Sequence, residues 1–125
     1  MSEDIQAQRA DLVRYLAEQT TVLAALLGIL RPPINVAAEG NLSVAVENMR
    51  HAADVLMERG GLNEAENLAL YAVENWITAA ILAHARSYHG MPKILRQSRF
   101  HAVVSFELAG RCLVALGGQL PPGAK

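Results

Sequence analysis

The sequence has one cysteine and no long hydrophobic run, and each shortage excludes a class of protein. A single cysteine, Cys112, cannot build an intramolecular disulfide framework or a cysteine-based zinc finger, so we expect a reducing, cytoplasmic compartment. The longest apolar run, residues 22–30, is far shorter than the roughly 20 residues that cross a bilayer, so no membrane contact is expected. The first four residues, Met-Ser-Glu-Asp, are acidic where a secretory signal is basic.

What the sequence holds instead is a high content of residues that favour helices. Its 125 residues are 52% hydrophobic, 5% aromatic and 18% charged, a balance typical of one globular domain rather than of a disordered chain. The hydrophobic residues are mostly Ala and Leu, both strong helix formers, and they recur at helical spacing. We therefore expect one helical domain over residues 1–118, followed by a flexible Pro- and Gly-rich tail over residues 119–125.

Proline, glycine and capping residues divide this domain into four helical segments. The first, residues 3–30, stops before Pro32 and Pro33, because proline supplies no N–H and disfavours a helical residue before it. A connector follows to about residue 40, and the second segment covers residues 41–59. Six of its apolar side chains are expected to face inward: Leu42, Val46, Met49, Ala53, Leu56 and Met57.

The third segment has a clear start signal. Gly60 and Gly61 end the second segment, as a left-handed cap does, and Asn63 with Glu66 three residues later forms a capping box. The third segment then runs to about residue 88. It has few polar positions for its length, so we expect it to be the most buried of the four.

The fourth segment begins at either of two residues and completes the predicted fold. Gly90-Met91-Pro92 interrupts the helical pattern, so the last helix starts at Pro92 or at Ser98 and ends at residues 117–118. Four helices with short connections favour an all-α, four-helix up-and-down bundle or a related helical array. Abundant Ala allows close helix approach but leaves little side-chain volume for a core. Surplus apolar surface is therefore expected to be buried in a homodimer.

Charge is divided unevenly along the chain. Residues 1–74 hold five basic and eleven acidic residues, whereas residues 75–125 hold six basic residues and one acidic residue. The basic residues Arg86, Lys93, Arg96 and Arg99 lie in a stretch without any carboxylate. Such a segment predicts a site for a phosphate, a nucleic-acid backbone or an acidic partner. The alternative is that these cations pair with the acidic first half inside the same bundle.

Arg96 and His101 form the most suggestive pair for chemistry. An arginine holds a phosphate by two parallel hydrogen bonds, and a histidine moves a proton near neutral pH. Together they suit metal-independent RNA cleavage, with the arginine stabilising charge on the transition state. Five residues along a helix place the two side chains about 140° apart. They converge only if Arg96 lies in a turn before a helix that Ser98 caps, or if a second subunit completes the site.

The other candidate residues are expected to lie in the core, at an interface or on a polar face of a helix. Tyr71, Glu74 and Thr78 form a polar stripe that is either a small-ligand site or a solvent-exposed face. His84 is expected to be a core or interface residue, and Cys112 a buried, inert thiol. Trp76 is expected in the core. No metal site or cofactor is predicted, since no two histidines are spaced i, i+4.

Two stretches resemble the HEPN superfamily, the helical domains named for nucleotide binding in higher eukaryotes and prokaryotes. Residues 70–75 followed by residues 79–82 are similar to the family's central helix, and Arg96 to His101 fits its pattern of Arg, four to six residues, then His. The resemblance implies a dimer with facing motifs that cleaves or binds RNA, often in toxin–antitoxin or defence systems. By position Arg96 is the phosphate-contacting arginine and His101 the catalytic histidine. Gln97 stands where the family usually has Asn, Asp or His.

The sequence thus predicts a homodimeric helical protein that binds RNA or nucleotide phosphates, with endoribonuclease activity as an open possibility. Arg96 and His101 are the candidate catalytic residues, and Arg99, Arg86 and Lys93 the candidate phosphate-binding residues. Two alternatives stay open. One is a non-catalytic adaptor with a protein partner, and the other is a bundle that binds a small ligand at the polar stripe.

Overall fold

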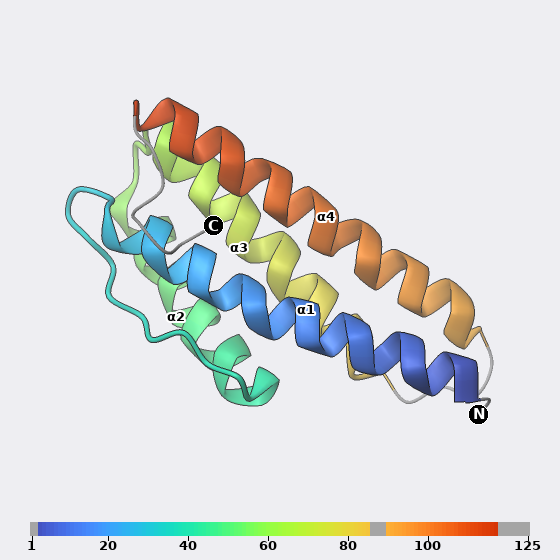
Figure 1. Cartoon of the computed structure of the whole chain (residues 1–125). Coiled ribbons are helices and arrows are strands. Elements are labelled where there is room, and N and C mark those ends of the chain that lie inside the picture. The colour runs from blue at the N-terminus through green and yellow to red at the C-terminus, as the bar shows by residue number, and fades with distance from the viewer. Residues whose placement is uncertain (1–2, 86–89, 118–125) are drawn as a thin grey trace.

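The computed structural model describes residues 3–85 and 90–117, and these form four α-helices. The helices are α1 (Glu3–Gly28), α2 (Leu42–Arg59), α3 (Glu64–Ala83) and α4 (Met91–Ala115), and no strand occurs in the described part. Figure 1 shows them packed as a bundle, which confirms the predicted all-α, four-helix fold. None of these helices is long and apolar enough to cross a membrane.

The starts of α2 and α3 agree with expectation. Asn41, the expected first residue of the second segment, caps α2 by accepting hydrogen bonds from the backbone N–H groups of Ser43 and Val44. Asn63 and Glu66 form the complete capping box at the start of α3. The helix ends differ more from expectation: α1 ends at Gly28, two residues before the expected residue 30, and α3 ends at Ala83, before the expected residue 88. The tail predicted over residues 119–125 lies outside the described residues.

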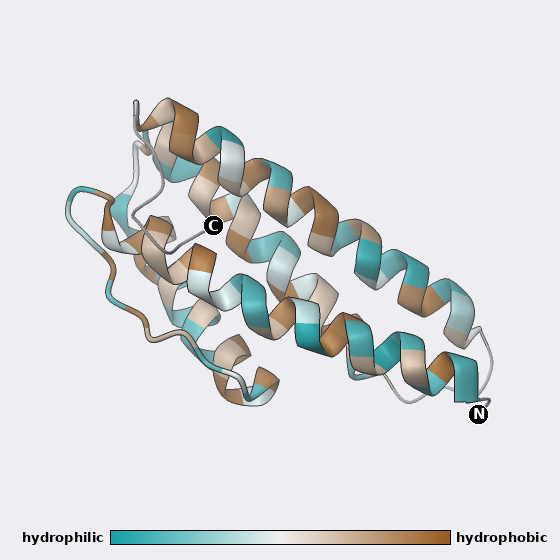
Figure 2. Ribbon diagram, in the orientation of Figure 1, coloured by the Kyte–Doolittle hydropathy of each residue, from teal (hydrophilic) through white to brown (hydrophobic). Residues whose placement is uncertain are grey.

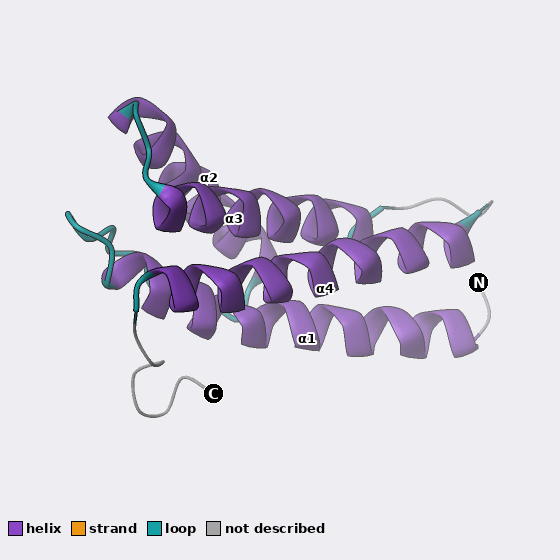
Figure 3. Cartoon of the chain, turned by 90° about the horizontal axis from the view of Figure 1, so that it is seen from above, coloured by secondary structure: helices purple, strands orange, loops and turns teal. Residues whose placement is uncertain are grey.

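The connector between α1 and α2 determines how the helices are arranged. It runs back along the bundle before α2 begins, while α1 and α4 start at the same end of the molecule (Figure 1). Figure 3 shows α2 crossing the long axis of the other three helices at a steep angle. Both α1 and α3 pack against each of the other helices, and the most extensive contact is the one between α3 and α4. Helix α3 is the most buried of the four, as the sequence predicts, with ten of its twenty residues buried.

Trp76 lies at the centre of this core, as predicted. Its side chain is fully buried, and its indole Nε1 donates a hydrogen bond to the backbone carbonyl of Leu16 on α1 at 3.0 Å. The hydrogen bond satisfies the polar atom of an otherwise apolar side chain, and leaving that atom unpaired would cost free energy. Trp76 therefore fixes α1 against α3.

Small residues form the contact between α3 and α4. Every buried residue of α4 lies at heptad spacing: Met91, Leu95, Ser98, Ala102, Ser105, Ala109 and Cys112. A matching series on α3 consists of Ala65, Ala69, Ala72, Trp76, Ala79 and Ala83, all buried. A sustained seven-residue repeat keeps the same faces of two helices in contact. With mostly Ala and Ser on both sides, the two backbones approach closely.

Hydrogen bonds fix the register of this contact. Ser98 Oγ donates to the carbonyl of Ala79, and Ser105 Oγ donates to the carbonyl of Ala72, both at 2.7 Å. One heptad further on, Cys112 Sγ lies 3.2 Å from the carbonyl of Ala65. These donors on α4 and acceptors on α3 are each seven residues apart. The opposite side of α4 is thereby turned outward.

One expectation about an individual residue is wrong, and two open ones are narrowed. Met57 is 55% exposed rather than inward, because it lies at the edge of the α2 face that packs on α3. His84, expected in the core or at an interface, is exposed, which excludes the core, since α3 ends at Ala83 and His84 is its C-cap residue. Of the two starts expected for the last helix, the structure agrees with the earlier one: α4 begins at Met91 after Gly90, and Ser98 lies inside the helix.

Candidate functional site

The predicted phosphate-binding residues lie in the first half of α4. Lys93, Arg96 and Arg99 are all exposed, and at about 100° per residue they project within roughly 120° of one another. We call these three residues the cationic face. The heptad contact of Ser98 and Ser105 with α3 directs the cationic face away from the bundle. Arg86, the fourth predicted cation, lies outside the described residues.

The cationic face is not neutralised by the described part of its own chain. In residues 3–85 and 90–117, ion pairs within 4.0 Å join Arg14 to Asp11 and Arg59 to Glu66, and none involves the cationic face. The acidic first half of the chain therefore does not supply the internal partners that the alternative interpretation requires of Lys93, Arg96 and Arg99.

The helix terminus adds to the positive potential there. The first turns of α1 and α3 contain acidic residues, whereas those of α2 and α4 contain none. The N-terminus of a helix carries a partial positive charge, which carboxylates usually offset. In α4 the first turn carries Lys93 instead, so the charge of the side chain adds to that of the helix end.

His101 lies at the boundary between α4 and α3. Its Nδ1 is 2.9 Å from Oδ1 of Asn75, and the Asn75 amide in turn donates from Nδ2 to the carbonyl of Tyr71 at 2.9 Å. This second bond orients the amide so that its oxygen faces the imidazole. His101 then donates from Nδ1, which leaves Nε2 as its acceptor in the neutral form. Phe100 lies edge-on to the imidazole, with ring centroids 5.5 Å apart.

The geometry of α4 separates the two candidate catalytic residues within one chain. Arg96 lies inside α4 rather than in a preceding turn, so it and His101 project about 140° apart. Arg96 is exposed, whereas His101 is half-buried against Asn75. Of the two routes to convergence that the sequence allows, only completion by a second subunit is left.

The alternative ligand stripe divides into two parts. Glu74 and Thr78 line a shallow hollow of about 310 Å³ between α2 and α3, together with Arg50 and Asp54. Tyr71 is 52% exposed and does not line this hollow. Thr78 Oγ1 donates to the carbonyl of Glu74 at 3.1 Å, so its hydroxyl is already used within α3. The stripe is mainly a solvent-exposed face of α3.

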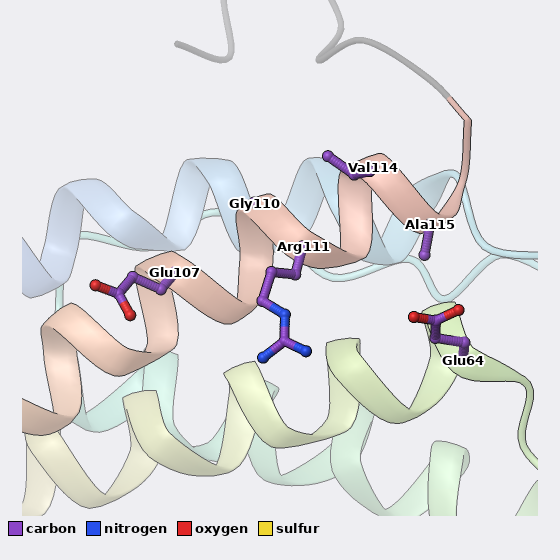
Figure 4. Close-up of a pocket in the computed structure, with 6 residues that line it drawn as sticks. All are labelled: Glu64, Glu107, Gly110, Arg111, Val114 and Ala115. Carbon is purple, nitrogen blue, oxygen red and sulfur yellow. The ribbon is translucent and has the colours of Figure 1, made fainter.

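A larger hollow, which sequence analysis did not identify, opens between the start of α3 and the end of α4. It has a volume of about 630 Å³ and is lined by Glu64, Glu107, Gly110, Arg111, Val114 and Ala115. Figure 4 shows the Arg111 guanidinium extending towards α3, with Glu107 on one side and Glu64 on the other. The lining mixes both signs of charge, so it lacks the positive potential of the cationic face.

Asn75 and the two serines of α4 are the residues that sequence analysis missed. Asn75 stands in a mainly apolar part of the sequence, and nothing in the sequence links it to His101. The serines did leave a signal, because Ser98, Ser105 and Cys112 are seven residues apart on a side of α4 that otherwise holds Met, Leu and Ala. That heptad repeat of small residues predicts a close helix contact.

The described residues contain no cluster of three or more His, Cys, Asp or Glu side chains that could hold a metal ion. Comparisons of the chain with protein-family models, with curated proteins and with solved structures find no match. The geometry of α4 is therefore the basis for assigning a function.

Proposed function

We propose that this protein binds RNA through phosphate contacts made by the cationic face of α4. The observation that carries the proposal is that Lys93, Arg96 and Arg99 are exposed on one side of the helix and have no carboxylate partner in the described residues. Phosphate contacts by Lys and Arg supply most of the affinity of sequence-independent nucleic-acid binding. Arginine also holds a phosphate by paired hydrogen bonds.

We propose that the protein binds RNA and that a single chain does not cleave it. Cleavage through Arg96 and His101 needs both side chains at one phosphate, and within α4 they project in different directions. The hydrogen bond between His101 Nδ1 and Asn75 gives the imidazole a structural partner between α3 and α4. A catalytic role for the pair would require a second subunit to bring one of them across.

The test of binding is fluorescence anisotropy with a labelled single-stranded RNA oligonucleotide. We expect the double variant Lys93→Ala/Arg96→Ala to bind at least tenfold more weakly, because two phosphate contacts are lost. The matched control is Arg14→Ala/Arg50→Ala, which removes two exposed arginines from α1 and α2. If both double variants lose affinity equally, binding follows net charge and the cationic face is not the site. Unchanged affinity in the first variant would also refute the proposal.

The test of cleavage uses the same oligonucleotide, analysed by gel electrophoresis after incubation with purified protein. We expect His101→Ala and the parent protein to leave the RNA equally intact. Cleavage that disappears in both His101→Ala and Arg96→Ala would instead establish the predicted catalytic pair. Because the two side chains project apart within one chain, a second subunit would then have to complete the site.

A further inference from the structure

The outer side of α4 carries an unusual amount of exposed hydrophobic surface. Of the eight large hydrophobic side chains exposed in the described residues, four lie on this helix: Phe100, Val103, Phe106 and Val114. Phe100 is 64% exposed and Val114 77% exposed. Figure 2 shows hydrophobic residues alternating with hydrophilic ones along α4. Exposed apolar patches of this kind mark contact surfaces.

Two unpaired charges of opposite sign flank the apolar centre. Arg99 lies four residues before Val103 and Glu107 lies four residues after it, both exposed. Eight residues of helix separate them by about 12 Å, so they cannot pair with each other within one chain. Neither has an ion-pair partner among residues 3–85 and 90–117.

We propose that a second copy of this chain covers this surface, with the two α4 helices antiparallel and the two-fold axis at Val103. In this register residue i of one α4 faces residue 206 − i of the α4 of the partner subunit. Val103 meets its own copy, Phe100 meets Phe106 of the partner subunit, and Arg99 meets Glu107 of the partner subunit. A two-fold axis repeats every contact, so one dimer gains two Phe–Phe contacts and two ion pairs.

The charges on this surface favour an antiparallel over a parallel pairing of the two α4 helices, and a second copy of the chain over RNA as the partner that covers it. A parallel pairing would place Arg99 beside Arg99 of the partner subunit and Glu107 beside its own copy, which is unfavourable. An RNA chain would leave the apolar centre at Val103 and Phe106 uncovered and would meet the carboxylate of Glu107. A second copy covers the apolar side chains and neutralises both charges.

The register also leaves the rest of α4 free of obstruction. Arg96 faces Gly110 of the partner subunit, and apart from the adjoining backbone of α4 no atom of the chain lies within 4 Å of the position that a Cβ at Gly110 would take. Two helices that cross diverge away from the crossing point, so Lys93 and Arg96 lie at the rim of the contact, where a phosphate can still reach them. In the dimer Arg99 pairs with Glu107 of the partner subunit, so Lys93 and Arg96 are the residues of the cationic face that are left for phosphate. The proposal does not rest on RNA binding, because its contacts involve only two copies of this chain.

The first test is the oligomeric state of the full chain, freed of nucleic acid, by sedimentation velocity over a range of protein concentrations. We expect a dimer, and we expect Val103→Glu to be monomeric because it places two carboxylates together on the axis. The matched control is Val44→Glu on α2, since Val44 and Val103 are both 44% exposed. A parent protein that is monomeric at every concentration would refute the proposal. So would a dimer that Val103→Glu leaves intact.

A charge-swap experiment tests the register itself. We expect Arg99→Glu and Glu107→Arg each to weaken the dimer at least tenfold, because each puts like charges together at two symmetric places. Mixing the two variants should restore association as a heterodimer, since both cross-pairs then have opposite signs. The double variant Arg99→Glu/Glu107→Arg should dimerise like the parent. Failure of the mixed variants to associate would overturn the register, even if the parent is a dimer.

Discussion

The Ser105 hydroxyl of α4 donates a 2.7 Å hydrogen bond to the backbone carbonyl of Ala72 on α3, in the middle of the close contact between these helices. Ser98 makes the same kind of bond one heptad before it, and Cys112 lies in the corresponding position one heptad after. The three contacts set the rotation of α4 on the bundle. They therefore decide which residues of α4 face α3 and which face solvent.

Replacing Ser105 tests how closely the two helices approach. We expect Ser105→Ala to lower the free energy of unfolding by about 1 kcal/mol, through the lost hydrogen bond. Ser105→Val should cost more, a further 1–3 kcal/mol or so, because the added methyl groups overpack a contact lined by Ala. The measurement is urea unfolding followed by circular dichroism. Ser43→Ala, at an exposed position of α2, is the control and should change stability by less than about 0.5 kcal/mol.

Arg9 closes the end of α3, and its removal should cost stability. Its Nε donates to the carbonyl of Ala83 at 2.9 Å, and its Nη2 donates to the carbonyl of Ala85. A cation at the negative end of a helix, bonded to carbonyls that lack helical partners, stabilises that end. We expect Arg9→Ala to lower the free energy of unfolding by about 1.5–3 kcal/mol, measured by urea unfolding.

The control for Arg9 is another arginine of α1. Arg14 is exposed and pairs with exposed Asp11 at 3.5 Å. Exposed pairs of this kind contribute little, so Arg14→Ala should change stability by less than about 1 kcal/mol. Equal losses in the two variants would mean that Arg9 acts only through the general charge of α1.

Cys112 should make the protein less stable in alkaline solution. Burial raises the pKa of its thiol from 9.0 to about 11, because the thiolate is poorly solvated next to α3. In the unfolded chain the thiol loses its proton more readily. Its contribution is therefore complete below pH 9 and is lost as the pH rises towards 11. Burial raises the pKa of Tyr15 too, which acts in the same direction.

The measurement is the free energy of unfolding at several pH values from 7 to 11, for the parent protein and for Cys112→Ser. Serine does not ionise in this range, so the variant should lose less stability between pH 9 and 11. The buried thiol should also react slowly with a thiol reagent at pH 7 in the folded protein. Parallel stability curves for the two proteins would show that Cys112 does not contribute to the alkaline loss.

Local signals predicted the helices well, and long-range contacts account for what was missed. The Asn63–Glu66 capping box predicted the start of α3, because capping depends on residues three positions apart. The start of α4 stayed open between Pro92 and Ser98, since Ser98 has the side chain of a cap but uses it on the carbonyl of Ala79. No local pattern contains that partner.

In the candidate site too, local sequence predicted some features, and long-range contacts determine the others. A stretch of sequence with no acidic residue predicted that Lys93, Arg96 and Arg99 lie together, but it left open whether the acidic first half of the chain pairs with them. That question depends on long-range packing, and among the described residues none of the three has an ion-pair partner. The position of His101 did not follow, because it depends on Asn75, 26 residues away on α3. The exposed apolar residues at Phe100 and Phe106 likewise became visible only once the heptad contact had fixed the rotation of α4.

The salt dependence of RNA binding tests the central claim most directly. Each phosphate contact to single-stranded RNA adds about 0.7 to the slope of log affinity against log salt concentration. The variant Lys93→Ala/Arg96→Ala should therefore have a slope flatter by about 1.4 than that of the parent protein. Equal slopes in the two proteins would contradict phosphate binding by the cationic face of α4.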